Sequence, residues 1–478
     1  MKSKRLVALI MSLILMVIPM FVYGGMLNVK STTVALLQDG NYDIEYNDKE
    51  YYKKSLISLF SIDNYQSFSQ YMYNALLNQQ EEIWVDNFNI PVSEFSSAFS
   101  KVINDNPDLF FVSSSVSYAY YNDGTTAYAR PRYTVSKDDL TQARDIFNKG
   151  ADKALAKVDD SMTDEQKALV LHDYICNAAT YSEDGEISHS AYGFFYNGRI
   201  VCAGYTLAYS YLLKQAGIES GFVSSKDMAH AWNSVKIDGK WYNADLTYDD
   251  IKYDNVNIYG NYGHTNFLKS DSYFSSEAGM YHFGGETYGN PTFNSTSYDN
   301  YFWNKVFSQI IVHNGDYYYV QPASRSYLIK RDLKGNESNL SKSAFNLPKL
   351  TITSSAVDSA GTEHQISNTD YMGRLEFLDN RFYLTSATGK ICSVAINGDI
   401  CVIDSGSNDY IIGMTTTNNE LTVQYYQNLA TPVTYSKLEY FNNYMSKPNG
   451  NSYNNYPDID YDGYINAKDY AMIKRSAS

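Results

Sequence analysis

The chain has 478 residues and a formal net charge of −15 at pH 7, with 38 Lys and Arg residues against 53 Asp and Glu residues. No basic cluster occurs beyond the first five residues, so nucleic acid is excluded as an expected partner, because phosphate binding requires clustered positive charge. The length predicts several domains, and the mixture of helical and strand-like patterns predicts an α+β protein.

Residues 1–24 predict a secretory signal peptide. Three basic residues precede an apolar run from Leu6 to Val22, and small residues follow at the expected cleavage position. The apolar run is long for a signal peptide, so an uncleaved membrane anchor is the alternative. We expect a secreted or cell-surface protein.

Residues 30–155 predict an N-terminal α+β domain. Helical spacing is seen in SFSQYMYNALLNQQ and SEFSSAFSKVINDNP, and a β-rich stretch follows with a turn at Asn122-Asp123-Gly124. Ser136 is placed as the N-cap of a further helix. No chemistry-bearing pattern stands out, so we expect this domain to be structural or to shape substrate binding.

Residues 156–295 carry the candidate chemistry. A helix is expected to begin after Thr163, because Gln166 follows three residues later in the order of a capping box. On that helix His172 and Cys176 lie four residues apart, a spacing compatible with a metal. Two ligands do not make a metal site, and we favour a packed helix face.

Cys202 stands directly before a second helical pattern. Leu207 and Tyr211 recur at helical spacing, and Gly217 is a natural stop. The N–H groups and the dipole at a helix N-terminus favour a thiolate, which is the reactive form of cysteine. The backbone N–H of Cys202 would be one oxyanion donor. The alternative is a small buried hydrophobic residue.

A predicted hairpin brings a histidine and an aspartate together. Asp238-Gly239 between two apolar–polar runs indicates a two-residue turn, which pairs Val235 with Tyr242. His230 is then the diagonal neighbour of Asp245, about 7–8 Å away between backbones, a gap that side chains can span. Asp245 would hold the imidazole and stabilise its charged form. A purely structural pair is the alternative.

Three stretches resemble the core of bacterial transglutaminase-like domains, relatives of the papain-like thiol enzymes. They are GRIVCAGYTLAYSYLLKQAGI, AHAWNSVKIDGKWYNADLTYDD and TNFLKSDSYFSSE, with the Cys, His-x-Trp-Asn and Trp-Tyr-x-x-Asp motifs in the family's order. The resemblance implies a papain/transglutaminase-like core and a catalytic triad of Cys202, His230 and Asp245. It also implies cofactor-free amide hydrolysis or acyl transfer on protein or cell-wall peptide. The alternative is a binding protein with an idle triad.

Other side chains near these motifs have weaker claims to a functional role. The place of Tyr192 in the family pattern makes it a candidate second oxyanion donor, although ordinary packing is the favoured role. His264 in GHTNF and His282 in MYHFGG are plausible neighbours of the site. We favour structural roles for both histidines.

Residues 300–442 read as repeated β-hairpins. VHNGDYYYVQ from Val312 recurs as FLDNRFYLTS from Phe377 and, more faintly, as TNNELTVQYY from Thr417. RDLKGN and VAINGD close the first two units. These repeats predict a partial, propeller-like β domain, with a β-sandwich as the alternative. Its expected role is binding, or packing against the enzyme.

The last two cysteines flank Asn397-Gly398. If this pair forms a two-residue turn, Cys401 faces Val394 and Cys392 is only a diagonal neighbour, at the outer limit for a disulfide. A bridge is therefore not favoured. The chain has four cysteines, too few for a disulfide scaffold of this size.

A linker, 443–456, precedes an acidic tail at 457–478. Aspartates alternate there, Gly463 follows, and a carboxylate closes the loop in twelfth place. This oxygen-rich pattern is the one that Ca²⁺ requires in an EF-hand-like loop. The expected ligands, with Tyr464 acting through its backbone carbonyl, are Asp458, Asp460, Asp462, Tyr464 and Asp469.

The tail PDIDYDGYINAKDYAMIKRS resembles a dockerin-type repeat. The resemblance implies structural Ca²⁺ and docking to a cohesin-type module on a scaffold protein, as in a cellulosome. Dockerins carry two such repeats and one is found here, with Asp469 where an ordinary EF-hand has Glu. We expect a scaffold- or surface-attached protein of a Gram-positive-type bacterium, monomeric outside its scaffold.

Overall fold

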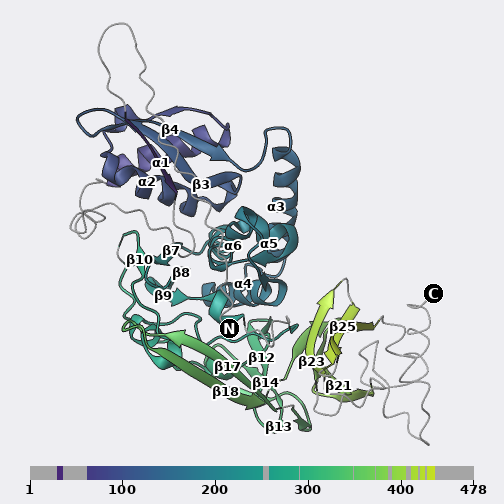
Figure 1. Ribbon diagram of the computed structural model, residues 1–478. Helices are drawn as coiled ribbons and strands as arrows, with labels where there is room; N and C mark the ends of the chain where they lie inside the picture. Colours follow the sequence, from purple (N-terminus) through teal and green to yellow (C-terminus); the bar gives the residue numbers. More distant parts are fainter. Residues whose placement is uncertain are drawn as a thin grey trace, which may run out of the picture. The chain divides into compact units, whose positions relative to one another are not determined.

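The computed structural model describes residues 30–35, 62–250, 258–289, 291–347, 349–371, 373–385, 390–404, 411–417, 420–425 and 428–435. The expected signal peptide and calcium loop lie outside these residues. The chain divides into two compact units, Met1–Asp145 and Ile146–Ser478. The division falls within helix α3, Leu140–Leu155. Figure 1 shows helices and strands in the first unit and in the early part of the second, and mainly strands in the green and yellow part of the chain.

The first unit is an antiparallel sheet with two helices. Both predicted helices form, and the expected turn closes at Gly124, whose φ is +85° and whose N–H donates to Tyr121 at 3.0 Å. Apolar faces of the helices supply buried rings such as Phe68 and Phe95. The elements are α1 (Ile62–Leu77), α2 (Val92–Asp105), η1 (Asp86–Phe88), η2 (Pro107–Leu109) and a sheet of order β1-β3-β4-β2, formed by Lys30–Ala35, Val112–Tyr120, Thr126–Tyr133 and Ile83–Trp84.

Helix starts largely follow the sequence signals. The Thr163 hydroxyl accepts the N–H of Gln166 at 3.2 Å, and the Gln166 side chain accepts the N–H of Thr163 at 3.1 Å, so the predicted capping box of α4 (Asp164–Ala178) is confirmed. Ser136 accepts the N–H of Asp139 at 3.2 Å just before α3 begins. These side chains satisfy N–H groups that the helices leave unpaired.

The second unit begins with helices around a small antiparallel sheet. Helix α6 (Cys202–Gln215) is buried along most of its length, and Gly217, with a φ of +84°, follows its C-cap Ala216. The sheet has the order β10-β7-β8-β9. Its strands and the neighbouring elements are β7 (Ser220–Ser225), β8 (His230–Ile237), β9 (Lys240–Ala244), β10 (Glu286–Thr287), β5 (Thr180–Tyr181), β6 (Arg199–Ile200), α5 (Ala191–Asn197), α7 (Leu246–Asp249), α8 (Asp271–Phe274), η3 (Glu186–His189) and η4 (Glu277–Gly279).

The β8–β9 hairpin has the predicted register. Ile237 pairs with Lys240 and Val235 with Tyr242. Asp238 and Gly239 have φ of +49° and +75°, the two positive values that a type I′ turn requires. The tight turn thus sets which residues of β8 and β9 face one another.

Three antiparallel meanders follow, and each opens with one of the repeated hairpins. The first has the order β11-β12-β14-β15, the second β19-β20-β21-β22 and the third β23-β24-β25. The hairpin repeats are therefore confirmed, while their assembly as a partial propeller stays a prediction. The elements of this region are η5 (Phe302–Lys305), β11 (Ile311–His313), β12 (Asp316–Val320), β13 (Arg325–Ser326), β14 (Leu328–Arg331), β15 (Glu337–Asn339), β16 (Phe345–Asn346), β17 (Lys349–Val357), β18 (Glu363–Tyr371), β19 (Leu375–Leu378), β20 (Arg381–Thr385), β21 (Lys390–Ala395), β22 (Ile400–Asp404), β23 (Ile411–Thr417), β24 (Glu420–Tyr425) and β25 (Asn428–Tyr435).

The turn between β21 and β22 differs from the prediction. Ser393, not Val394, pairs with Cys401, so the register is shifted by one residue. Gly398 has a φ of +87°, which lets the loop take a third residue. The Ala395 N–H donates to the Asp399 carbonyl at 2.9 Å, and the Gly398 N–H donates to the Ala395 carbonyl at 2.8 Å. Cys392 is buried and pairs across the strands with Val402, and the disfavoured bridge to Cys401 stays a prediction.

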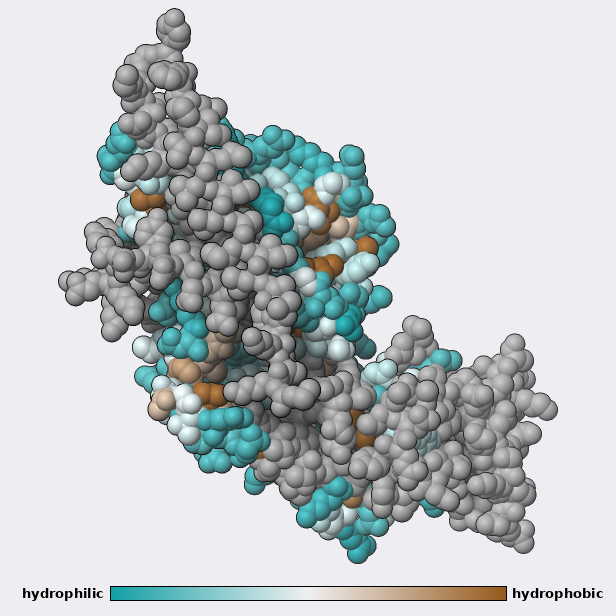
Figure 2. Space-filling model, viewed as in Figure 1, coloured by the Kyte–Doolittle hydropathy of each residue, from teal (hydrophilic) through white to brown (hydrophobic). Residues whose placement is uncertain are grey.

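The visible face of the described chain is mainly hydrophilic. Figure 2 shows apolar residues there in small separate groups. Among the described residues, no helix combines the length and apolar character needed to cross a bilayer.

Candidate active site

Cys202 occupies the first position of helix α6 and is 2% exposed. The preceding residue, Val201, donates its N–H to the Ser188 carbonyl at 3.0 Å. Gly204 lets the first turn lie close to this loop, since a Cβ at that position would be 2.4 Å from the same carbonyl oxygen. The Cys-Ala-Gly sequence therefore places the thiol at the positive end of a helix, where a thiolate is favoured.

Strand β8 is attached to helix α6 through Asn233. Its side-chain amide donates to the Thr206 carbonyl at 2.9 Å and to the Ser210 hydroxyl at 2.8 Å. Asn233 is buried, so these bonds are formed away from water. The asparagine of the His-x-Trp-Asn motif thus holds the strand of His230 against the helix of Cys202.

His230 and Asp245 form the contact expected from the hairpin. His230 Nε2 lies 2.7 Å from Asp245 Oδ2, which leaves Nδ1 for other partners. The His230 side chain is 8% exposed and that of Asp245 is 1% exposed. The ring of His230 stacks on Tyr248, with centroids 4.8 Å apart. These contacts fix both the tautomer and the plane of the imidazole.

The charges of this pair stabilise each other. Burial acts to lower the pKa of His230, but the Asp245 carboxylate and a hydrogen bond with Cys202 raise it to about 10. Burial acts in the opposite direction on Asp245, but His230 and His282 hold the pKa of that carboxyl well below its usual range. An imidazolium next to Cys202 is the partner that makes a thiolate favourable.

A second histidine also reaches Asp245. His282 Nε2 lies 2.8 Å from Asp245 Oδ2, the same oxygen that contacts His230. The sequence made His282 a plausible neighbour of the site with a structural role favoured, and the contact with Asp245 was not predicted because the residue lies 37 positions further along the chain. His230, Asp245 and His282 offer metal-ligating atoms in one group, but their 2.7 and 2.8 Å separations are hydrogen-bond lengths.

A second buried polar network lies between α4 and α7. His172 contacts Asp173 at 2.9 Å and Asp249 at 3.2 Å, and His264 contacts Asp173 at 2.8 Å. Cys176 Sγ lies 3.8 Å from His172 Nε2, and burial raises the pKa of this thiol to about 12. His172 and Cys176 therefore form a packed helix face, as favoured from the sequence. His172, Asp173 and His264 could together hold a metal, but the distances between their polar atoms match hydrogen bonds.

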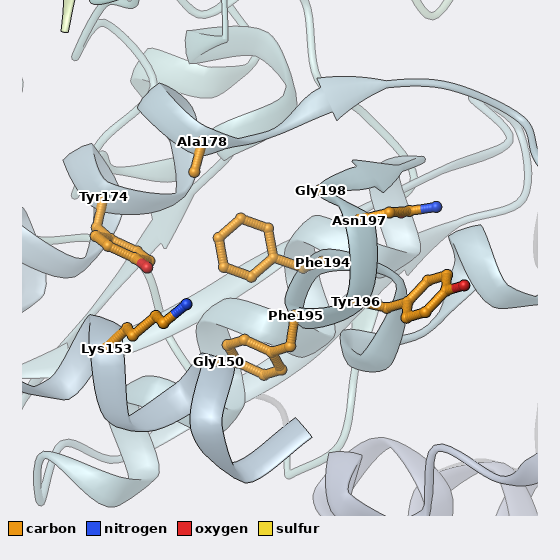
Figure 3. A pocket seen from close by; sticks show the side chains of 9 residues that line it. All are labelled: Gly150, Lys153, Tyr174, Ala178, Phe194, Phe195, Tyr196, Asn197 and Gly198. Carbon is orange, nitrogen blue, oxygen red and sulfur yellow. The ribbon is translucent and has the colours of Figure 1, made fainter. Parts of the chain in front are cut away.

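Two further features involve helix α5, namely Tyr192 and a hollow. Tyr192 is on α5, where its ring stacks on Tyr196 at 5.4 Å, and its role as an oxyanion donor stays a prediction. A hollow of about 220 Å³ is lined by Gly150, Lys153, Tyr174, Ala178 and residues 194–198. Figure 3 shows Lys153, Tyr174 and Phe194 directed toward it. Cys202, His230 and Asp245 do not line this hollow.

The match to a protein-family model agrees with a thiol-enzyme class of site. Residues 152–246 match the family model of the transglutaminase-like superfamily, and Cys202, His230 and Asp245 all fall within this segment. The segment is therefore transglutaminase-like, and such a domain points to cysteine-based acyl chemistry.

One solved structure, described as "Crystal structure of a TGase", is 15% identical to this chain with a TM-score of 0.20. The alignment covers 30% of this chain and 47% of that chain, so the present chain spans less than half the length of that protein. Comparison with curated proteins gives no match.

Proposed function

We propose that the protein is a secreted, cysteine-dependent amide hydrolase or acyltransferase of the transglutaminase-like class. Cys202 is the nucleophile, His230 transfers the proton and Asp245 orients His230. The observation that carries this proposal is the 2.7 Å His230–Asp245 contact beside a cysteine at a helix N-terminus. Burial and charge at these residues support an ion pair rather than a neutral thiol.

The proposed reaction proceeds in two steps. The Cys202 thiolate attacks the amide carbonyl, and the backbone N–H of Cys202 stabilises the oxyanion. The C–N bond then breaks as the His230 imidazolium gives its proton to the leaving amine, which leaves a thioester on Cys202. In the second step His230 takes a proton from water or an amine, which attacks the thioester and releases the thiolate.

We favour water as the acceptor and protein or cell-wall peptide as the substrate. Cys202 and His230 are nearly buried, so a substrate must present an exposed, extended amide to reach them. The reaction as written requires no metal or cofactor, since the thiolate and imidazolium supply both the nucleophile and the acid.

The first test is the rate of Cys202 alkylation by iodoacetamide, followed by peptide mapping. The wild-type protein should react rapidly near pH 6, well below the free-thiol pKa of about 8.5, and His230→Ala should lose this reactivity. His313→Ala is the matched control. Cys176 should remain unlabelled in the native protein because it is buried and its pKa is about 12.

The alternative is a non-catalytic, scaffold-borne adhesion protein with an idle triad, in which the β-meanders and the tail do the binding. Equal alkylation of the wild type and His230→Ala, both only near pH 8.5, would favour it. If the ion pair is present, peptides incubated with and without a primary amine will distinguish hydrolysis from transamidation.

We also propose that the tail binds structural Ca²⁺ and docks to a cohesin-type scaffold module. The alternating aspartates from Asp458 to Asp462 and the closing Asp469 support this. Titration of the full chain with Ca²⁺ by calorimetry should give one site, which Asp460→Ala abolishes and Asp160→Ala, at an exposed position, leaves intact. Absence of binding in the wild type would exclude both parts of the proposal.

A further inference from the structure

The Asp245 carboxylate accepts four hydrogen bonds, and two of them come from imidazoles. His230 Nε2 and His282 Nε2 approach Oδ2 at 2.7 and 2.8 Å. The backbone N–H groups of Thr247 and Tyr248 donate to Oδ1 at 2.9 and 3.2 Å. The two backbone bonds fix one end of the carboxylate, and His282 is the side chain that fixes the other end with His230.

Both ring nitrogens of His282 face atoms that can only accept. Nε2 faces the ionised Asp245 carboxylate, and Nδ1 lies 2.6 Å from the Gly279 carbonyl oxygen. An N–H at Nε2 satisfies the carboxylate oxygen, which can only accept. The residue is 4% exposed, so water cannot substitute for a missing donor.

The backbone before His282 adopts an unfavourable conformation, which places the His282 ring against Asp245. Met280 and Tyr281 have φ of +56° and +58°, a region that side-chain-bearing residues rarely occupy. The His282 N–H then donates to the Phe274 carbonyl at 2.8 Å, and its ring stacks on that of Phe274 with centroids 4.1 Å apart. Such strain persists where surrounding contacts determine the local structure, and it clusters at functional sites.

A residue with left-handed backbone also precedes His230. Ala229, directly before His230, has a φ of +50°. The rings of His230 and His282 are 5.9 Å apart, and the Trp232 ring lies 5.1 Å from that of His282. Two strained segments from different parts of the chain therefore present two imidazoles to one oxygen.

We propose that His282 is a positioning residue for the reaction of Cys202. By donating to Oδ2, it holds the Asp245 carboxylate in the orientation that keeps His230 Nε2 bound and Nδ1 available to Cys202. His282 acts through Asp245 and does not contact the reacting atoms. This inference rests on the proposed function, because it assigns His282 to the same thiol site.

Two substitutions of similar length separate hydrogen bonding from packing. His282→Gln retains an N–H near the position of Nε2, whereas His282→Met has none. We expect alkylation of Cys202 at pH 6 to slow about 10- to 100-fold in His282→Met, the range for losing one charge-assisted hydrogen bond, and to stay within about threefold of wild type in His282→Gln. His313→Met is the control for a half-buried histidine away from Asp245.

Thermal melting of each variant checks that the fold is retained. If His282→Met does not melt cooperatively, His282→Phe replaces it, because a phenyl ring keeps the stack on Phe274 and lacks both N–H groups. The inference is overturned if the Gln and Met variants react alike, whether both at the wild-type rate or both slowly. A wild-type protein with no reactivity near pH 6 would instead refute the proposed function itself.

Discussion

The side-chain amide of Asn233 donates to the carbonyl oxygen of Thr206 at 2.9 Å, which joins strand β8 to helix α6 in the interior of the protein. His230 begins that strand and Cys202 begins that helix. Asn233 lies three residues after His230, and Thr206 lies four residues after Cys202. The hydrogen bond between them therefore helps to set the position of the candidate base relative to the nucleophile.

We predict that Asn233→Ala lowers the free energy of unfolding by about 1–3 kcal/mol, the usual range when a buried hydrogen-bonding partner is removed. Asn233→Asp should cost more, because a carboxylate cannot donate to Thr206 and would bury a charge. Both variants should also slow Cys202 alkylation. Urea unfolding provides the measurement, and Asn294→Ala, at an exposed position, is the control. Unchanged alkylation in a destabilised variant would contradict the proposed coupling.

Gly204 should be intolerant of even one additional carbon. A Cβ there would lie 2.4 Å from the Ser188 carbonyl oxygen and 2.7 Å from Ile200 Cβ, and a backbone oxygen cannot rotate away. We expect Gly204→Ala to cost about 1–3 kcal/mol through overpacking and to displace the first turn of α6. Gly221→Ala is a matched control, because the nearest atom to its Cβ is the rotatable hydroxyl of Ser234 at 2.7 Å. Equal melting temperatures for the two variants would refute this prediction.

The His230–Asp245 pair predicts a pH-dependent difference in stability. The pKa of His230 is raised from 6.5 to about 10 by folding, so its contribution is fully present below pH 6.5 and is lost as the pH rises through about 10. The stability difference between the wild type and Asp245→Asn should therefore be greatest near pH 6 and should shrink toward pH 10.

The quantity to measure is the difference in the free energy of unfolding between the wild type and Asp245→Asn, because other groups titrate between pH 6 and pH 10. Burial lowers the pKa of Lys269 from 10.5 to about 7, so its unfolded state binds more protons and its effect on stability rises with pH. This opposite contribution cancels when the two urea-unfolding series are subtracted. A pH-independent difference would show that His230 is not charged in the folded protein.

Local turn chemistry explains what could be predicted from the sequence and what could not. Asp238-Gly239 supplied a two-residue turn, and the register that places His230 near Asp245 followed from it. Asn397-Gly398 has equivalent chemistry, yet Gly398 adopts a positive φ as the last residue of a three-residue loop, and the pairing of Cys401 moves by one position. Two loops with the same local sequence preference thus differ in length by one residue, and the local sequence does not distinguish them.

Long-range polar contacts were beyond sequence reasoning. The contact between His282 and Asp245 depends on left-handed backbone at Met280 and Tyr281, and neither residue type indicates that conformation. The network of His172 with Asp249 joins residues 77 positions apart. Periodicity predicts that a helix face is buried, but it does not identify the partner of a polar group on that face.

This second network should matter for the candidate site because it holds the far end of α7. Asp245 caps the helix at its start, and Asp249 at its last residue is buried against His172 at 3.2 Å and accepts the N–H of Asn266 at 2.9 Å. We predict that Asp249→Asn lowers the free energy of unfolding by about 1–3 kcal/mol, since it removes one of the two buried carboxylates that contact His172 and leaves Asp173 as the other.

The same variant should slow Cys202 alkylation, because a loosened α7 no longer holds the two N–H groups that donate to Asp245. The double variant His172→Gln/Asp249→Asn tests whether the two residues are energetically coupled. Replacing both charges with amides that can bond each other should recover part of the lost stability, so the double variant should be more stable than the sum of the single effects indicates. If the two effects simply add, the network does not anchor α7, and the position of Asp245 depends on its own cap alone.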